Sequence, residues 1–277
     1  MKRIVTVQDI SCLGKCSLTV ALPIISAMGV EASVVPTAVL STHTMFKEFT
    51  FRDLDDSIGD IARHFGELGL DFDAIYTGYL GSFEQLRLMS EFFDTFKTDD
   101  NLIVVDPVMG DNGRLYTGFT EEFAAEMAKL CGKADIIVPN MTEAAFMLGI
   151  PYRETYDEAY AQDVLRKLCK LGAKKAVLTG ASYMPNKVGV LTYDSATDTF
   201  TSYFHDRINA SYHGTGDVFA STCVGALMNG FALDEALKVA ADYTVECIRL
   251  TEAQPDHNIY GVNFESAIPY LIRRIGK

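Results

Sequence analysis

The residues best suited to chemistry lie in the segment Gly214-Thr215-Gly216-Asp217, which is followed by apolar and small residues at helical spacing. This order places two glycines and a carboxylate at the start of a helix, where backbone N–H groups without partners attract negative charge. A carboxylate there can accept a proton from a hydroxyl group that attacks a phosphoryl group. The alternative is an ordinary turn before a helix whose first turn includes an acid. Such tetrapeptides are common, so this segment alone leaves both interpretations open.

Three further segments place polar or glycine residues directly after apolar runs, at 77–82, 106–110 and 139–143. A carboxylate such as Asp106, at the carboxyl end of a strand, is well placed to act on Mg²⁺ or phosphate. Asn140 and Glu143 also fit the two positions of a capping box, so a purely structural role is a strong alternative for them. Gly78 and Gly81 fit a simple turn equally well.

Apolar runs alternate with segments of helical spacing, and this alternation positions the polar segments. Buried strands rich in Val and Ile are predicted over residues 4–7, 32–40, 74–77, 102–105, 136–138 and 176–179. Helices are predicted over 14–28, 82–96, 121–130 and 158–171, with a long helical region over 216–250. The pattern predicts an α/β fold with a mostly parallel central sheet flanked by helices on both faces. Ligands bind such sheets at the carboxyl ends of the strands.

Two features interrupt the alternation. Residues 46–51 mix aromatic and charged side chains and are predicted to form a flap strand over the site. Residues 188–193 and 199–204 are predicted to form an antiparallel pair joined by a turn. No linker, low-complexity segment or charge block divides the chain, so residues 1–277 are predicted to form a single domain.

The composition argues against several classes of partner. The formal net charge is −13, with acidic residues spread along the chain, which disfavours nucleic acid. It does not disfavour ATP, because helix-start N–H groups attract phosphate whatever the overall charge. No segment resembles a signal peptide or reaches the roughly 18 apolar residues of a membrane span, so a cytoplasmic protein without a membrane partner is expected. The six cysteines lack metal-type spacing; Cys12 and Cys16 are expected to be reduced, at a helix start.

Taken together, the motifs resemble a known family. Gly-Thr-Gly-Asp at 214–217, Asn-x-x-Glu at 140–143 and Asp-Pro-Val-Met-Gly at 106–110 resemble the ribokinase-like kinases. Ser-Thr-His-Thr at 41–44 and Gly-Tyr-Leu-Gly-Ser at 78–82 resemble the vitamin B6 kinases, that is the pyridoxal and pyridoxamine kinases, within that superfamily. The opening Val-Gln-Asp-Ile at 7–10 lies where those kinases carry Gln-Ser-His-Val. The resemblance covers essentially the whole chain, and five ordered motifs are far more specific than any one of them.

The resemblance implies a ribokinase-like fold with a small flap, and ATP-dependent phosphorylation of the 5′-hydroxymethyl group of pyridoxal, pyridoxamine or pyridoxine. It implies that Asp217 is the general base, with the N–H groups of Gly214, Thr215 and Gly216 as the anion hole. It also implies Mg²⁺ as a cofactor and a homodimer, and leaves open whether a monovalent cation such as K⁺ takes part.

The resemblance also divides the remaining site residues into two groups. The vitamin pocket is expected to be lined by Asp9, His43, Thr44 and Tyr79. The ATP region, with Asp106 and Glu143 nearest the metal, is expected to include Asp106, Val138, Asn140, Glu143, Thr179 and Gly180.

The chain departs from the family mainly around Asp9. This residue stands where a Ser usually contacts the vitamin ring, Ile10 replaces the His after it, and Leu40 replaces a Phe. These departures leave the preferred vitamer open. Alternatively, Asp9 turns away and caps a helix that begins near Ser11.

Three other functions compete with a B6 kinase. A hydroxymethylpyrimidine kinase has the same chemistry, but such kinases begin with a Gly/Ser-rich turn that this chain lacks. A non-catalytic vitamer-binding relative would not need Asp217 together with Glu143. A dinucleotide-dependent oxidoreductase is disfavoured because no Gly-x-Gly-x-x-Gly turn follows the first strand.

Overall fold

The computed structural model describes residues 1–277 and is built around one nine-stranded sheet with the order β11-β10-β9-β8-β5-β4-β1-β2-β3. Its six central strands are parallel: β1 (Arg3–Ser11), β2 (Glu31–Leu40), β4 (Ala74–Thr77), β5 (Leu102–Val105), β8 (Ile136–Ile137) and β9 (Lys175–Ala181). The outer strands run antiparallel: β3 (Phe51–Asp53), β10 (Lys187–Asp194) and β11 (Thr199–Asp206). The predicted mostly parallel α/β sheet and the antiparallel pair are confirmed.

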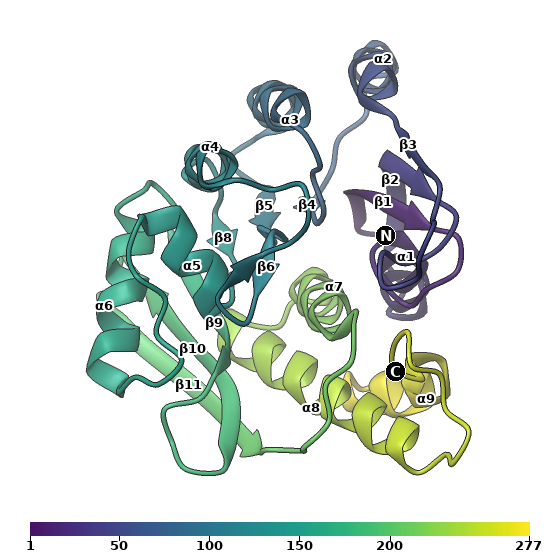
Figure 1. Cartoon of the computed structure of the whole chain (residues 1–277). Coiled ribbons are helices and arrows are strands. Elements are labelled where there is room, and N and C mark those ends of the chain that lie inside the picture. Colours follow the sequence, from purple (N-terminus) through teal and green to yellow (C-terminus); the bar gives the residue numbers. More distant parts are fainter.

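Helices cover both faces of the sheet (Figure 1). One face carries α2 (Asp55–Glu67), α3 (Phe83–Phe96), α4 (Glu121–Cys131), α5 (Met141–Leu148) and α6 (Glu158–Cys169). The other carries α1 (Leu18–Ala27), α7 (Thr215–Met228), α8 (Leu233–Glu252) and α9 (Phe264–Arg274). None of these helices has the length and apolar character needed to span a membrane.

The sheet separates two apolar cores of similar size, with 36 buried residues on one side and 32 on the other. Successive strand residues alternate between them, so that Val5 and Val7 pack in one core and Ile4 packs in the other. Because both faces are covered, the central strands are largely apolar on both faces, which is why they form near-continuous apolar runs in the sequence.

Some predicted boundaries differ from the structure. The helix predicted over 14–28 begins only at Leu18, because residues 12–17 form an irregular loop in which Ser17 has a φ of 51°. The helical region predicted over 216–250 is divided into α7 and α8. A short hairpin of β6 (Gly110–Asp111) and β7 (Arg114–Leu115) was not predicted. Its Asn112-Gly113 turn is a strong hairpin signal that could have revealed it.

The flap strand predicted over 46–51 is wrong. Residues 41–50 form a loop, and β3 begins only at Phe51, which pairs with Leu40 of β2. Glu48 has a φ of 58°, a left-handed conformation that no extended strand accommodates. The mixed aromatic and charged pattern therefore belongs to an exposed loop beside the sheet edge.

Candidate active site

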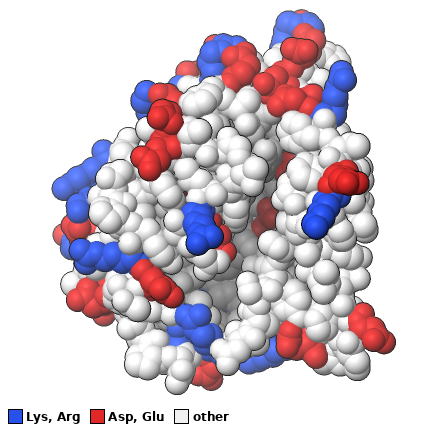
Figure 2. Space-filling model, in the orientation of Figure 1, with Lys and Arg blue, Asp and Glu red and all other residues white.

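Most of the predicted site residues lie at or just beyond the carboxyl ends of the central parallel strands, near the start of α7 (Figure 1). In the space-filling view, a hollow separates the part of the molecule that contains β1, β2 and β3 from the rest (Figure 2). Acidic side-chain atoms are visible in its depth. The start of α7 and the carboxyl ends of the central strands lie beside this hollow.

The start of α7 is shaped by Gly214, its N-cap residue. Gly214 has a φ of 76°, and a Cβ atom built on it would lie 1.8 Å from the carbonyl oxygen of Lys15. Only glycine fits this left-handed conformation and close approach. The first N–H of the helical ladder belongs to Val218, which donates to the Gly214 carbonyl at 3.0 Å. The N–H groups of Thr215 and Gly216 precede this ladder and are available to an anion.

Asp217 lies in the first turn of α7, beside these N–H groups. Burial raises the pKa of its carboxyl group to about 7; hydrogen bonding to the Ser17 backbone opposes this rise and the charge of Asp9 adds to it. A carboxyl group with a pKa near neutral is suited to general-base catalysis.

Asp106 and Glu143 are two further buried acids of the site and lie near each other. Asp106 is 7% exposed, and its carboxylate has neither a hydrogen-bond donor nor a cation beside it. Glu143 is 4% exposed and accepts the N–H groups of Met109 at 3.1 Å and Asn140 at 2.9 Å. Burial raises the pKa of both groups, and the repulsion from Glu143 raises that of Asp106 further. Two buried acids without a cation are electrostatically uncompensated.

This uncompensated pair fits Mg²⁺. No cluster of three His, Cys, Asp or Glu side chains could hold a metal ion by itself. Mg²⁺ in nucleotide sites uses one or two carboxylates together with phosphate oxygens and water, so a larger cluster is not required. The free Asp106 carboxylate is the better direct ligand, since the Glu143 oxygens are already engaged by backbone donors.

Asn140 and Glu143 also form the capping box that their spacing predicted. The Asn140 Oδ1 accepts the Glu143 N–H at 2.9 Å, and the Glu143 carboxylate accepts the Asn140 N–H. Asn140 Nδ2 donates to the Gly110 carbonyl at 2.8 Å, and the Gly113 N–H donates to Thr142 Oγ1 at 2.9 Å. These bonds hold the β6–β7 hairpin against α5.

The residues expected around the nucleotide are only partly brought together. Thr179 bridges to Asn140, and its N–H donates to the Pro139 carbonyl at 2.9 Å. Gly180 follows it and is exposed. Val138, by contrast, is 3% exposed and packs in the apolar core that also contains α7, so its side chain supports the sheet.

Asp9 does not cap a helix, so that alternative was wrong. It lies inside β1, is 5% exposed, and accepts the Ser11 hydroxyl at 3.1 Å. The nearest helix, α1, begins only at Leu18. Burial raises the pKa of Asp9, while hydrogen bonds from Ser17 and Ser11 lower it. Cys12 and Cys16 likewise lie in the loop before α1, and both are free thiols.

The other predicted pocket residues lie on two loops. Tyr79 follows β4; burial, together with the nearby charge of Asp9, raises the pKa of its hydroxyl to about 12. His43 stacks on His213, with 4.5 Å between the ring centres, which joins the 41–50 loop to the residue before the anion hole. Thr44 is exposed on the same loop, and no hydrogen bond joins its side chain to another predicted residue.

The sequence did not reveal the role of the loop at 12–17. Lys15 packs its main chain against Gly214, and Ser17 lies between Asp9 and Asp217, whose pKa values it lowers. No local motif marks these residues, because their partners are far away in the chain.

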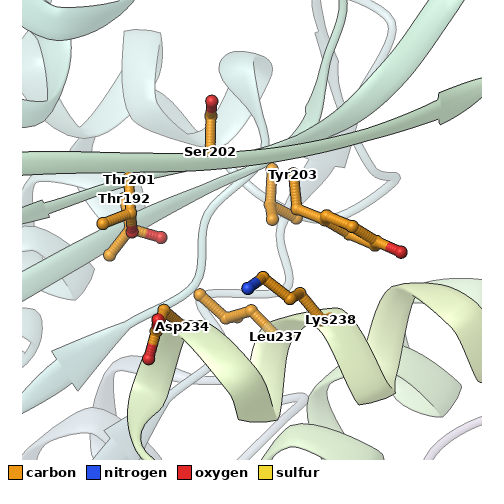
Figure 3. Close-up of a pocket in the computed structure, with 8 residues that line it drawn as sticks. Thr192, Thr201, Ser202, Tyr203, Asp234, Leu237 and Lys238 are labelled. Atoms are coloured by element: carbon orange, nitrogen blue, oxygen red, sulfur yellow. The ribbon is translucent and has the colours of Figure 1, made fainter.

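One cavity lies apart from these residues. It has a volume of about 160 Å³ and is formed between β10, β11 and the first turns of α8 (Figure 3). Thr192, Tyr203 and Lys238 line it, and Lys238 Nζ is already paired with Glu235 at 2.6 Å. None of the predicted site residues lies there.

Comparisons with known proteins find similar chains of known fold and family. A family model described as phosphomethylpyrimidine kinase matches residues 21–263. A putative phosphomethylpyrimidine kinase from Bacteroides thetaiotaomicron, crystallised with pyridoxal, is 40% identical, with a TM-score of 0.93 over 98% of this chain and 95% of that chain. Pyridoxal kinase from Lactobacillus plantarum is 30% identical, with a TM-score of 0.91 over 99% and 97%. A pyridoxine/pyridoxal/pyridoxamine kinase from Bordetella avium is 28% identical over 265 residues, which is 90% of this chain and 86% of the relative.

Proposed function

Because this chain belongs to the phosphomethylpyrimidine kinase family, we propose that it transfers the γ-phosphoryl group of ATP to the 5′-hydroxymethyl group of a vitamin B6 vitamer. The observation that carries this proposal is the start of α7, where available N–H groups stand beside the carboxyl group of Asp217. The first feature attracts a transferring phosphoryl group, and the second accepts the proton of the attacking hydroxyl.

The protein needs to contribute little covalent chemistry to this reaction. The substrate hydroxyl oxygen forms a bond to the γ-phosphorus, the bond to the bridging β,γ-oxygen breaks, and ADP leaves with that electron pair. Asp217 takes the hydroxyl proton. The N–H groups of Thr215 and Gly216 stabilise the negative charge on the phosphoryl oxygens. Asp106, with Glu143 beside it, would hold Mg²⁺, which neutralises phosphate charge when bound.

A B6 vitamer is favoured over a pyrimidine precursor by the relatives. The Bacteroides protein was crystallised with pyridoxal, and the Lactobacillus protein is a pyridoxal kinase. The family description names phosphomethylpyrimidine, so hydroxymethylpyrimidine remains the competing substrate. Both substrates present a hydroxymethyl group on an aromatic ring, and the same base and anion hole serve either one.

An ATP-consumption assay across pyridoxal, pyridoxamine, pyridoxine and hydroxymethylpyrimidine tests the proposal. We expect turnover with at least one B6 vitamer and weaker turnover with hydroxymethylpyrimidine. Exclusive use of hydroxymethylpyrimidine would identify the protein as a hydroxymethylpyrimidine kinase instead. The absence of ATP consumption with all four, in folded protein that binds pyridoxal, would support a non-catalytic binder.

Several finer assignments are part of the same proposal. We place Asp9, His43, Thr44 and Tyr79 around the vitamer, and Asn140, Thr179 and Gly180 around ATP. We further expect a homodimer, which sedimentation velocity would detect as a species of twice the 30.5 kDa chain mass. A cytoplasmic location stays a prediction.

A further inference from the structure

The loop at 12–17 directly supports the anion hole. A Cβ atom on Gly214 would lie 1.8 Å from the Lys15 carbonyl oxygen and 3.4 Å from Cys16 Cα. The main chain of Lys15 is therefore packed against the residue that opens α7. Any movement of Lys15 toward α7 must displace Gly214, and with it the N–H groups that follow.

The C-terminal segment 260–265 also contacts Lys15. The Lys15 N–H faces the Tyr260 carbonyl at 3.4 Å. A Cβ atom on Gly261 would lie only 2.5 Å from Lys15 Cβ. Two glycines from distant parts of the sequence thus pack closely against Lys15, Gly214 against its carbonyl oxygen and Gly261 against its Cβ.

The side chain of Lys15 is held as firmly as its main chain. It is only 14% exposed, and its ammonium donates to Asn263 Oδ1 at 3.0 Å and to Glu265 Oε2 at 2.7 Å. The ammonium also lies 5.7 Å from the centre of the Phe264 ring. Holding a lysine in one rotamer costs considerable side-chain entropy, so such complete fixation of a loop lysine is unusual.

The acceptor Asn263 is itself immobilised by the end of α8. Its N–H donates to Thr251 Oγ1 at 2.7 Å, and its Nδ2 donates to Gln254 Oε1 at 2.7 Å. A continuous set of contacts therefore runs from α8 through Asn263 and Lys15 to Gly214. The ammonium is engaged by these partners and is not free to serve as a phosphate ligand.

We propose that Lys15 is a positioning residue that fixes the N–H groups at the start of α7 by tying the 12–17 loop to the segment 260–265. This inference rests on the proposed function, since the placement of those N–H groups matters for phosphoryl transfer. A displacement of about 1 Å at a reacting centre can lower turnover by up to about 10²-fold.

The test compares Lys15→Met with Lys2→Met. The first keeps the apolar stem and removes the ammonium; the second breaks the Lys2–Asp73 pair of 2.6 Å at the start of β1, which is the opposite end of that strand. We expect Lys15→Met to lower kcat about tenfold while KM for pyridoxal changes less than about twofold. Hydrogen–deuterium exchange in peptides covering 212–218 should become faster. Lys2→Met should leave kcat, KM and the exchange rate at 212–218 unchanged.

Two further measurements keep the outcome decisive. Glu265→Gln alters an exposed acceptor and should give the same changes to a smaller degree, so it replaces Lys15→Met if that variant does not fold. The exchange measurement does not depend on turnover, so it tests Lys15 even if the wild-type protein phosphorylates none of the vitamers. Unchanged exchange at 212–218 in folded Lys15→Met, or a loss of kcat that only follows the fraction unfolded, would overturn the inference.

Discussion

The two ends of the hollow are built in different ways. At the β5–β8–β9 end, Asp106 and Asn140 follow β5 and β8, Thr179 lies in β9, and a capping box between near neighbours fixes Asn140 and Glu143. At the β1–β2 end, the loops at 12–17 and 41–50 are held by contacts to α7 and to residues 260–265. The first end rests on regular strands and a local capping box, supplemented by hydrogen bonds to the β6–β7 region, whereas the second is held mainly by contacts between distant segments.

This difference suggests how the two ends contribute to the proposed reaction. The β5–β8–β9 end is part of the regular sheet, so it is suited to features that every member of the reaction class needs, namely phosphate and Mg²⁺. The β1–β2 end depends on loops, which vary more easily and commonly carry specificity. Asp217 lies at the start of α7, between the two ends, and accepts the hydroxyl proton in the proposed reaction.

The largest effect is expected at Asp217, because both ends serve its proton transfer. Asp217→Asn keeps the shape of the helix start but removes the proton acceptor. We expect kcat to fall on the order of 10²-fold or more, with ATP binding and the fold largely intact. Steady-state kinetics and nucleotide binding by calorimetry check this, and Asp234→Asn in the first turn of α8 is a matched control. Near-normal turnover would remove Asp217 from the mechanism.

The same division explains what could be predicted from sequence. The six parallel strands, the capping box at Asn140 and the helix start at Gly214 were predicted because periodicity and short spacings are local signals. Residues 14–17 were predicted to begin a helix because the apolar residues after them fit that period, whereas Lys15 and Ser17 are fixed by residues of α7 and of the C-terminal segment. Contacts of this kind leave no trace in local spacing. The strand predicted over 46–51 was wrong for another reason, since the left-handed conformation of Glu48 is not encoded by the alternation of aromatic and charged residues.

A smaller effect is expected from Glu143→Gln, which tests the β5–β8–β9 end alone. Glutamine can still accept the Asn140 N–H through its carbonyl oxygen, so the capping box survives in part. Removing the charge beside Asp106 weakens the hold on Mg²⁺, so the Mg²⁺ concentration for half-maximal turnover should rise about tenfold, with little change in KM for the vitamer. An unchanged Mg²⁺ titration would restrict Glu143 to its capping role.

The free energy of unfolding should depend on pH because burial raises the pKa of Asp217. Burial raises the pKa of Asp217 to about 7, so the folded protein retains a proton that the unfolded chain has already lost. Stability due to this group is present at low pH and is lost as pH rises through about 7. We expect the free energy of unfolding of metal-free protein to fall on the order of 1 kcal/mol between about pH 5 and about pH 8.

Thermal unfolding across this pH range, for the wild type and Asp217→Asn, measures the change. The variant has no titrating carboxyl group at this position, so its curve should be flatter and its stability at about pH 8 higher than that of the wild type. A parallel pair of curves would show that the pKa of Asp217 is not raised in the folded state.

The smallest and most specific effect is expected at the β1–β2 end, for Asp9→Ser. Asp9 is 5% exposed, and its only partners are hydroxyl and backbone groups, so a cationic group of the substrate would compensate its charge. Two geometries are possible: contact with the protonated ring nitrogen that all B6 vitamers share, as in enzymes that use pyridoxal phosphate, or contact with the amino group that only pyridoxamine carries.

The two geometries give different outcomes for kcat/KM in Asp9→Ser. We predict contact with the amino group, in which case pyridoxamine loses on the order of tenfold in kcat/KM and pyridoxal much less, because only pyridoxamine brings the extra positive charge. Equal losses for the two vitamers would instead place the ring nitrogen beside Asp9. Asp9→Asn is the matched control, since it keeps the size of the side chain and removes only its charge. If neither variant changes kcat/KM for either vitamer, Asp9 has no contact with the substrate. The β1–β2 end then does not set specificity through this residue.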